Sequence, residues 1–294
     1  MSSNQAPNVT SHISSLGIVG SGIMGSGIAE VAAKTGHRVV LRSRQQSSAD
    51  AMVAAMAKSL AKQLERGKIT EQLRDEAMSR VTATSDLGAL ANCDLVLESI
   101  VEDLPTKQAL FADLDKICNP DTILATNTST LPVIEMATRT GRADRVCGVH
   151  FFNPATSMTL VEIVRPLTAS DATIAAVTAF ATACGKDAVQ VADRAGFIVN
   201  ALLFPYLNNA IRMLEHGTAS MADIDTAMKG GCNFPMGPFA LLDLVGLDTS
   251  LAILDALYAE FADPNYAAMP TLRRMVSAGR FGRKSGSGFY DYSR

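Results

Sequence analysis

Residues 16–25, with the sequence LGIVGSGIMG, contain the pattern that decides the fold. Four apolar residues typical of a strand precede the glycine motif, and a helical pattern follows it. In such a GxGxxG loop, Gly20 permits a tight turn, Gly22 lets the backbone approach a pyrophosphate, and Gly25 lets the helix pack closely on the strand. The free N–H groups at the start of the helix attract phosphate. The stretch therefore predicts a dinucleotide-binding strand–loop–helix unit.

Strand-like and helix-like patterns alternate from this motif to about residue 193. The short β-rich runs lie at 16–19, 38–41, 94–100, 122–127, 145–152, 159–164 and 188–191. The helical patterns between them lie at 24–35, 48–67, 70–79, 104–118 and 171–184. Strands that alternate with helices indicate βαβ units and a mostly parallel sheet. We expect an α/β domain with a Rossmann-type doubly wound sheet over residues 13–193.

The pattern changes after residue 193, where the strands stop. Helical patterns follow at 197–217, 221–229, 239–261 and 271–278, with Pro205 expected to kink the first of them. We predict an all-helical substrate and dimerisation domain over residues 194–294. Its long segments are apolar around much of their circumference, which favours a homodimer interface. The polar residues 1–12 are expected to form a disordered tail.

Composition excludes several classes of protein. The 294 residues suffice for about two domains, and 48% hydrophobic with 19% charged residues excludes global disorder. The 26 basic and 29 acidic residues give a net charge of −3, so nothing indicates nucleic-acid binding. No apolar run reaches the length of a membrane-spanning helix. The first twelve residues lack the basic and apolar regions of a secretory signal or transit peptide.

The cysteines indicate a reducing compartment. They are odd in number, scattered and never in a CxxC pair, at Cys93, Cys118, Cys147, Cys184 and Cys232. This pattern argues against a disulfide framework and against a structural zinc site, and we expect no bound metal. The sequence is therefore typical of a cytoplasmic protein.

The choice of nicotinamide cofactor is expected to depend on residues just after the second strand. An NAD site usually has an acidic residue there, bonded to the ribose 2′-hydroxyl. Here the position is Ser43, with Arg42 and Arg44 beside it. Serine removes the repulsion of a 2′-phosphate, and Arg44 can form a charge-assisted bond to that group. These residues predict NADP as the cofactor. The alternative is NAD, with both arginines as solvated surface charges.

His150 stands out among the four histidines. It lies near the end of the apolar run RVCGVHFF, and strand ends are where α/β sheets bind ligands. Glu162 is the only acid within the apolar run TLVEIV, where an unpaired carboxylate would be costly. A strand–turn–strand arrangement could pair the two side chains, and the pair would suit a general base in hydride chemistry. The alternative is a structural pair that closes the sheet edge.

Two further polar residues are candidates for the same pocket. Ser129 follows the run TILATN, so it is expected at a strand end. Asn200 lies within an apolar helical pattern, and a buried amide needs partners. Simpler interpretations are a helix cap or turn residue for Ser129 and a self-satisfied core amide for Asn200.

With these motifs in place, the sequence resembles the short-chain 3-hydroxyacyl-CoA dehydrogenase family, including its bacterial 3-hydroxybutyryl-CoA members. The resemblance covers roughly residues 13–292. It rests on GIVGSGIMGSGIA (17–29), VED (101–103), ATNTST (125–130), HFFNP (150–154), LVEIV (160–164), DRAGFIVN (193–200), PMGPFALLDLVGLD (235–248) and GRKSGSGFYDY (282–292). Several ordered motifs at family-like spacing are more specific than any one of them.

The resemblance implies reversible hydride transfer between a nicotinamide cofactor and the 3-hydroxyl or 3-oxo group of a short acyl-CoA. It makes His150 the acid/base, Glu162 its partner, and Ser129 and Asn200 contacts of the reacting oxygen or the thioester. It also implies a homodimer. Cofactor contacts are implied for the glycine loop, including Ile23 and Met24, and for Glu102, Lys107, Asn127 and Lys284. Ser59 and Arg66 lie where the helical arm of the family meets coenzyme A.

Two departures from the family pattern are visible. The usual acid after the second strand is Ser43, and the arginine of the GFIxNR pattern is replaced by Ala201. Related enzymes act on acyl-carrier-protein thioesters or free hydroxy acids, so these remain alternative substrates. A different class of function is a non-enzymatic structural protein recruited from the family.

Overall fold

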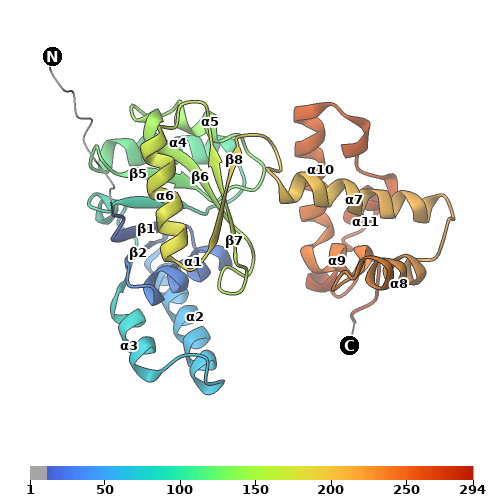
Figure 1. Cartoon of the computed structure of the whole chain (residues 1–294), viewed down its shortest axis with the longest axis horizontal. Helices are drawn as coiled ribbons and strands as arrows, with labels where there is room; N and C mark the ends of the chain where they lie inside the picture. The colour runs from blue at the N-terminus through green and yellow to red at the C-terminus, as the bar shows by residue number, and fades with distance from the viewer. Residues whose placement is uncertain (1–11, 294) are drawn as a thin grey trace, which may run out of the picture. The chain divides into compact units, whose positions relative to one another are not determined.

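The structure, a computed structural model, describes residues 12–293, so the tail predicted for residues 1–12 lies outside the described residues except at its last position. The chain divides after Asp193 into two compact units (Figure 1). The first unit contains an eight-stranded sheet, and the second contains helices and short 3-10 turns. This confirms the predicted class, which is a Rossmann-type doubly wound sheet followed by an all-helical domain.

The sheet has the strand order β3-β2-β1-β4-β5-β6-β7-β8. Every neighbouring pair is parallel except β6 and β7, which are antiparallel. Chain order reverses on either side of β1, and ligands of doubly wound sheets bind at such a reversal. The strands are β1 (Ser15–Val19), β2 (Arg38–Arg42), β3 (Val81–Thr84), β4 (Leu95–Glu98), β5 (Ile123–Thr126), β6 (Val146–Phe151), β7 (Leu160–Arg165) and β8 (Asp187–Ala192).

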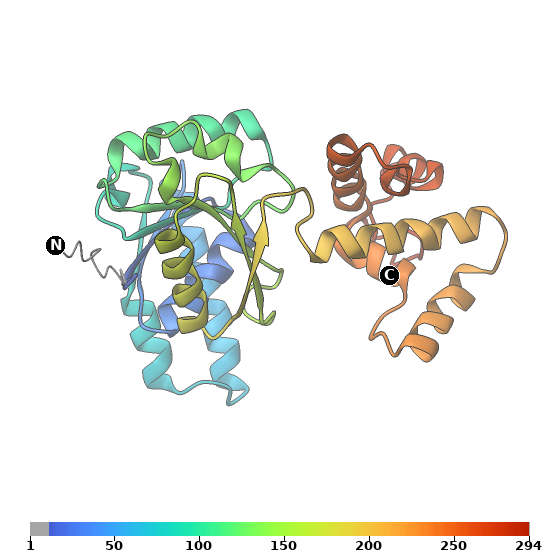
Figure 2. The same cartoon turned by 45° about the horizontal axis from the view of Figure 1, so that its top comes forward.

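Helices cover both faces of this sheet. Side chains of α1, α2 and α6 share one core with strand residues such as Leu16 and Ile163. Gly148 faces the other side, where a Cβ atom would lie 3.3 Å from Val133 of α5. Figure 2 shows α6 in front of the strands. The helices of this unit are α1 (Ile23–Lys34), α2 (Gln46–Glu65), α3 (Glu71–Ser79), α4 (Leu104–Ile117), α5 (Val133–Ala137) and α6 (Asp171–Ala183), with 3-10 turns η1 (Gly88–Leu90) and η2 (Ala143–Arg145).

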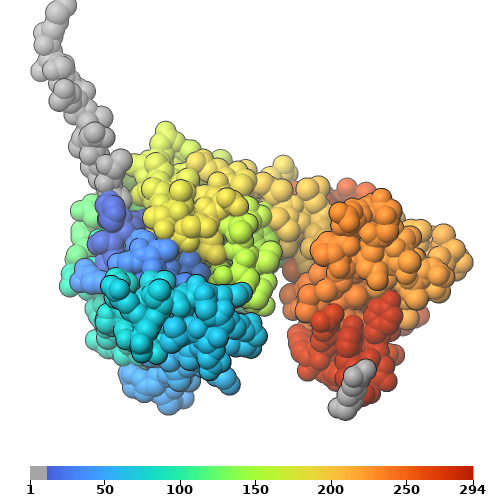
Figure 3. All heavy atoms as spheres, turned by 60° about the horizontal axis from the view of Figure 1, so that its bottom comes forward, coloured from blue at the N-terminus to red at the C-terminus, as the bar shows by residue number. Residues whose placement is uncertain are grey.

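Side-chain caps start several of these helices. Thr70 accepts a hydrogen bond from the N–H of Leu73 at α3, and Asp103 accepts one from the N–H of Thr106 at α4. Ser170 caps α6 in the same way. These caps satisfy N–H groups that have no partner within the helix. In Figure 3 the blue and cyan atoms of α2 and α3 stand at the front of the first unit, so these helices form an arm beside the sheet.

The second unit has its own core, which includes Phe204, Phe239 and Leu257. Its helices are α7 (Val199–Glu215), α8 (Met221–Cys232), α9 (Pro238–Val245), α10 (Leu247–Phe261) and α11 (Pro270–Ser277), with 3-10 turns η3 (Pro264–Tyr266) and η4 (Arg283–Ser285). Helix α7 continues through Pro205. Within residues 12–293, no helix combines the length and the apolar character needed to cross a membrane.

Helix boundaries within the second unit differ from the expectation at two places. The single helix expected over 239–261 is two helices, because Gly246 has a φ of +102° and ends α9. The helix expected from residue 197 starts at Val199, because Gly196 and Phe197 have φ values of +74° and +50°. At both places the backbone has a positive φ, which is incompatible with a continuous right-handed helix.

Candidate active site

The glycine loop joins β1 to α1 with the geometry that a dinucleotide requires. Gly20 has a φ of +135°, and a Cβ atom there would lie 2.2 Å from the carbonyl oxygen of Ser99. A Cβ atom on Gly25 would lie 2.9 Å from the carbonyl oxygen of Gly20, so this glycine permits close packing of α1 on the strand. A Cβ atom on Gly22 would enter open space. The loop therefore leaves room for a ligand above the start of α1.

A cavity of about 620 Å³ opens over this loop. Its walls include Gly20, Gly22, Ser43 and Arg44, all of which were predicted from the sequence to bind the cofactor. Gly22 is the N-cap of α1 and makes no side-chain cap bond, so the first N–H groups of the helix are open to a phosphate. Gly25 does not line the cavity and packs against the loop at Gly20 instead. Ile23 is highly exposed and Met24 is half-buried, and neither lines the cavity.

Two arginines and a serine lie where β2 ends against this cavity. Ser43 is 6% exposed, and its N–H donates to the carbonyl oxygen of Thr84 at 3.1 Å. The Nε atom of Arg42 is buried and has no hydrogen-bond partner among residues 12–293. Burial lowers the pKa of Arg42, and the positive charge of Arg44 lowers it further. A buried, unpartnered guanidinium nitrogen beside a second guanidinium fits an anionic group of the nucleotide.

His150 and Glu162 occupy directly paired positions of the antiparallel strands β6 and β7. Nδ1 of His150 lies 2.8 Å from Oε2 of Glu162, and both side chains are almost fully buried. A carboxylate at this distance accepts the Nδ1–H and leaves Nε2 to face the ligand side. The strand–turn–strand pairing proposed from the sequence is therefore present in the structure.

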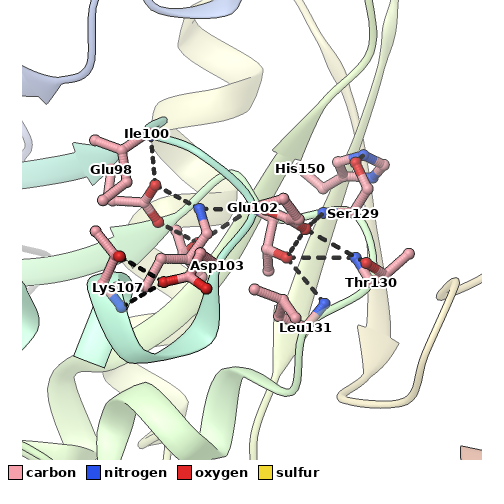
Figure 4. A network of polar contacts seen from close by, with 12 residues as sticks. Glu98, Ile100, Glu102, Asp103, Lys107, Ser129, Thr130, Leu131 and His150 are labelled. Carbon is pink, nitrogen blue, oxygen red and sulfur yellow. Dashed lines mark hydrogen bonds and ion pairs between the residues drawn. The ribbon is translucent and has the colours of Figure 1, made fainter. Parts of the chain in front are cut away.

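Ser129 completes this group from the turn that follows β5. Its Oγ lies 3.0 Å from Nε2 of His150. Oε1 of Glu102 accepts a hydrogen bond of 3.1 Å from the N–H of Ser129, and it also accepts the hydroxyl of Thr128. Figure 4 shows Glu102 among the residues of this turn, with Ser129 next to His150. The turn is thus held by a carboxylate from the β4–α4 connection.

Asn127 and Lys107 stabilise the segments next to this turn, one by a hydrogen bond and the other by an ion pair. Oδ1 of Asn127 accepts a hydrogen bond of 2.8 Å from the N–H of Phe151, which ties the end of β5 to β6. Lys107 is 1% exposed and forms an ion pair of 2.5 Å with Glu98, which is 0% exposed. Glu98 was not among the residues predicted from the sequence. The signal was available, because Glu98 is an acid inside the apolar run DLVLESI, as Glu162 is in its own strand.

A second, smaller cavity lies between the arm and the β6–β7 connection. Its volume is about 240 Å³, and it is lined by Ser59 and Arg66 of the arm together with Lys62, Gln63, Lys68, Thr156 and Ser157. Three of these side chains are cationic and none is acidic, so the cavity favours an anion. The structure therefore brings Ser59 and Arg66 together around one basic cavity.

The other two predicted residues belong to the second unit. Asn200 is 8% exposed in the first turn of α7. Lys284 lies in η4 and forms an ion pair of 2.6 Å with Asp248.

These observations define a class of protein. A nucleotide cavity at the glycine loop and a paired histidine and carboxylate at neighbouring strand ends suit hydride transfer with acid/base help. Residues 15–194 match the model of the 3-hydroxyacyl-CoA dehydrogenase NAD binding domain, and residues 196–292 match that of the 3-hydroxyacyl-CoA dehydrogenase C-terminal domain. The chain belongs to the 3-hydroxyacyl-CoA dehydrogenase family, which confirms the resemblance inferred from its motifs.

Particular relatives cover nearly the whole chain. A 3-hydroxybutyryl-CoA dehydrogenase of Mycobacterium tuberculosis is 47% identical over 95% of this chain and 99% of its own. The human mitochondrial hydroxyacyl-coenzyme A dehydrogenase is 43% identical over 94% of this chain and 90% of its own. The crystal structure of (S)-3-hydroxybutyryl-CoA dehydrogenase PaaH1 from Ralstonia eutropha has a TM-score of 0.94 and 42% identity, covering 96% of this chain and 100% of that one.

Proposed function

We propose that this protein is an (S)-3-hydroxybutyryl-CoA dehydrogenase that transfers a hydride reversibly between a nicotinamide cofactor and C3 of a short acyl-CoA. The observation that carries the proposal is the buried His150–Glu162 pair, with Ser129 3.0 Å from the outer ring nitrogen. Relatives that match 95% and 96% of the chain are named for this activity. No observation on the described residues favours the alternative of a non-enzymatic structural protein.

His150 acts as the acid/base in this proposal. In the oxidation, Nε2 takes the proton of the 3-hydroxyl group while the hydride leaves C3. In the reduction, the protonated ring donates a hydrogen bond and then the proton to the 3-oxo group. Glu162 stabilises the positive ring in both directions, and acid/base help of this kind accelerates reactions by about 10²- to 10⁴-fold. A nicotinamide cofactor, when bound, supplies the hydride chemistry.

Ser129 and Asn200 are proposed to bind the reacting oxygen or the thioester region. The Ser129 hydroxyl is already within hydrogen-bond distance of Nε2, where the 3-oxygen has to arrive. Glu102, Asn127 and Lys284 stay proposals as cofactor contacts, and they rest on the family resemblance. The cavity at the glycine loop supports contacts from Gly20, Gly22 and the start of α1.

The basic cavity on the arm supports coenzyme A as the carrier of the acyl group. Coenzyme A has a pyrophosphate and a 3′-phosphate. The prosthetic group of an acyl-carrier protein has one phosphodiester, and a free hydroxy acid has no phosphate. Arg66, Lys62 and Lys68 place three positive charges around this cavity. A site with this charge favours the most highly phosphorylated of the three substrates.

We propose NADP as the preferred cofactor and NAD as the alternative. The support is the absence of a carboxylate at Ser43, the exposed Arg44 beside it, and the unpartnered Nε of Arg42. A 2′-phosphate gives the two guanidinium groups a shared counter-ion. Ser43→Asp is therefore expected to lower kcat/KM for NADPH by about tenfold, the equivalent of one charge-assisted hydrogen bond, and to shift preference toward NADH.

The matched control for this variant is Ser47→Asp, which adds the same charge at an exposed position of α2. Steady-state rates with NADPH and NADH measure the preference of each protein. A wild-type protein that clearly prefers NADH contradicts the cofactor assignment, whatever the variants do.

The protein is also proposed to be a homodimer in a reducing compartment such as the cytoplasm. Large apolar side chains are exposed on the second unit, where they suit an interface: Ile198, Leu202, Met213, Phe234, Leu244 and Tyr258. The cysteines are free thiols, and four of the five are buried. Sedimentation equilibrium reports the mass in solution and tests the dimer.

The activity is tested with acetoacetyl-CoA and reduced nicotinamide cofactor. The purified protein is expected to oxidise the cofactor, and His150→Gln is expected to lose at least about 10²-fold in kcat because an amide cannot take up the proton. The amide still donates a hydrogen bond to Glu162, so the fold is preserved. His216→Ala removes an exposed histidine and serves as the control. Equal activity of wild type and His150→Gln refutes the mechanism.

A further inference from the structure

Glu30 is a buried acid that the proposed mechanism does not use. It lies within the apolar run IAEVAA of α1 and is 2% exposed. Burying a carboxylate is costly unless other groups bond to it. One partner comes from the arm, because the side-chain amide of Gln63 in α2 donates to Oε1 of Glu30 at 2.6 Å. Glu30 therefore links the helix that follows the glycine loop to the arm.

The amide group of Gln63 is held at both of its ends. Nζ of Lys34 donates to Oε1 of Gln63 at 2.9 Å and lies 3.6 Å from Oε1 of Glu30. An amide oxygen only accepts and an amide NH₂ only donates, so a cation on one side and a carboxylate on the other allow a single orientation of the amide. The NH₂ group of Gln63 is thus turned toward Glu30.

The fixed amide sets the hydrogen-bonding direction of Ser59. Nε2 of Gln63 also donates to Oγ of Ser59 at 3.2 Å, one turn earlier in α2. Among residues 12–293, the hydroxyl proton of Ser59 has no acceptor. Ser59 and Gln63 line the basic cavity of the arm, whereas Glu30 and Lys34 do not. The hydroxyl of Ser59 is therefore available to donate to an anion in this cavity.

We propose that Glu30 is a positioning residue for the acyl-CoA substrate, which acts through the amide of Gln63 to keep the Ser59 hydroxyl turned as a donor toward a phosphate of coenzyme A. This inference rests on the proposed function, in which the basic cavity binds coenzyme A. If the amide were turned round, its oxygen would face Ser59 and compete with the phosphate for the hydroxyl proton. Glu30 thus favours the binding of an anion although it is itself negatively charged.

Two simpler roles of Glu30 predict different results. If Glu30 acted on the substrate by its charge alone, its removal would lessen the repulsion of the phosphates and lower KM for acetoacetyl-CoA. If it only packed the arm against α1, its effect would add to that of losing Ser59. The positioning role predicts a higher KM for acetoacetyl-CoA that depends on Ser59. It leaves kcat and KM for the phosphate-free thioester acetoacetyl-N-acetylcysteamine unchanged.

The first test compares Glu30→Met with Glu30→Gln. Both variants remove the charge, but only glutamine keeps an oxygen that accepts from Gln63. Glu30→Met is expected to raise KM for acetoacetyl-CoA, and the calorimetric Kd for coenzyme A, by about fivefold, whereas Glu30→Gln stays within about twofold of wild type. Thermal melting establishes that each variant is folded. Glu71→Met removes an exposed carboxylate of the arm and is the matched control.

Gln63→Met breaks the same link from a half-buried position and is expected to match Glu30→Met, so the test stays decisive if Glu30→Met does not fold. A lower KM for acetoacetyl-CoA in both Glu30 variants means that only the charge acts, and this overturns the proposal. Wild-type KM and Kd in the folded Glu30→Met and Gln63→Met variants overturn it as well.

The second test is a double-mutant cycle with Ser59→Ala. Loss of the hydroxyl is expected to raise KM for acetoacetyl-CoA by about tenfold, as for one hydrogen bond to a charged group. Because Glu30 is proposed to act through Ser59, the double variant is also expected to show about a tenfold rise. A rise of about fiftyfold, the product of the two single effects, overturns the positioning role.

The same cycle separates this inference from the proposed function. If Ser59→Ala leaves KM for acetoacetyl-CoA and Kd for coenzyme A at the wild-type values, both the coenzyme A site and the positioning role fail. If Ser59→Ala raises them and Glu30→Met does not, only the positioning role is rejected. The proton-transfer mechanism is judged independently by His150→Gln.

Discussion

Replacing Glu162 by glutamine tests the central pair with the smallest change of shape. Nδ1 of His150 and Oε2 of Glu162 are 2.8 Å apart, and their side chains are 6% and 1% exposed. Solvent therefore screens this interaction little. A hydrogen bond to a charged group contributes about 1.5–3 kcal/mol, against about 0.5–1.5 kcal/mol for a neutral one. The variant keeps the neutral bond and loses the charge.

The difference of about 1–2 kcal/mol applies to the transition state, in which positive charge develops on the ring. It corresponds to a decrease in kcat of about 5- to 30-fold. An amide that turns its NH₂ group toward Nδ1 holds the wrong tautomer and decreases the rate further. KM for acetoacetyl-CoA is expected to change little, because Glu162 is buried behind the imidazole ring.

The assay is steady-state reduction of acetoacetyl-CoA, accompanied by thermal melting to confirm that the variant is folded. Glu71→Gln, on the arm and 74% exposed at its side chain, is the control for removal of one carboxylate. A folded Glu162→Gln protein with kcat equal to wild type refutes the reasoning, since the carboxylate then contributes nothing to the charged ring.

Two further predictions concern the arm and the thiols. Arg66→Ala is expected to raise KM for acetoacetyl-CoA by about fivefold, as for the loss of one exposed ion pair, and to leave KM for the phosphate-free acetoacetyl-N-acetylcysteamine unchanged. An equal rise for both thioesters argues against a phosphate contact. Burial raises the pKa of Cys93, Cys118 and Cys184 to about 11 and that of Cys147 to about 12, so these thiols stay protonated at neutral pH. A chromogenic disulfide reagent is expected to label exposed Cys232 first and the other four only after unfolding; rapid labelling of all five contradicts the burial.

Sequence patterns predicted the elements with strong periodicity and missed two of the short ones, β3 and α5. Strand β3 is four residues long and pairs only with β2 at the sheet edge. None of its side chains is fully buried, so its sequence shows no clear alternation of apolar and polar residues. Helix α5 spans five residues, which is too short for a helical period. The break at Gly246 was missed because apolar residues continue on both sides of it, and a single glycine does not reveal its φ angle.

The candidate site was likewise predicted only in part from the sequence. His150 and Glu162 could be paired from the sequence because an acid in a buried strand needs a partner and the spacing allowed a hairpin. The role of Glu102 at the 128–130 turn could not be predicted, because it depends on how the β4–α4 connection lies beside β5. Arg42 was noticed only as a neighbour of Ser43, since an unpartnered buried nitrogen is visible only in three dimensions.

Under the proposed function, the pairing of His150 with Glu162 on β6 and β7 separates proton transfer from recognition of the substrate carrier. The strand register sets these two positions opposite each other, so a change in the connection between the strands that keeps this register also keeps the imidazole and its carboxylate aligned. That connection supplies Thr156 and Ser157 to the basic cavity. Under the proposed function, a variant whose connection is altered without a shift of register can therefore accept a different thioester carrier while the proposed proton-transfer pair stays intact.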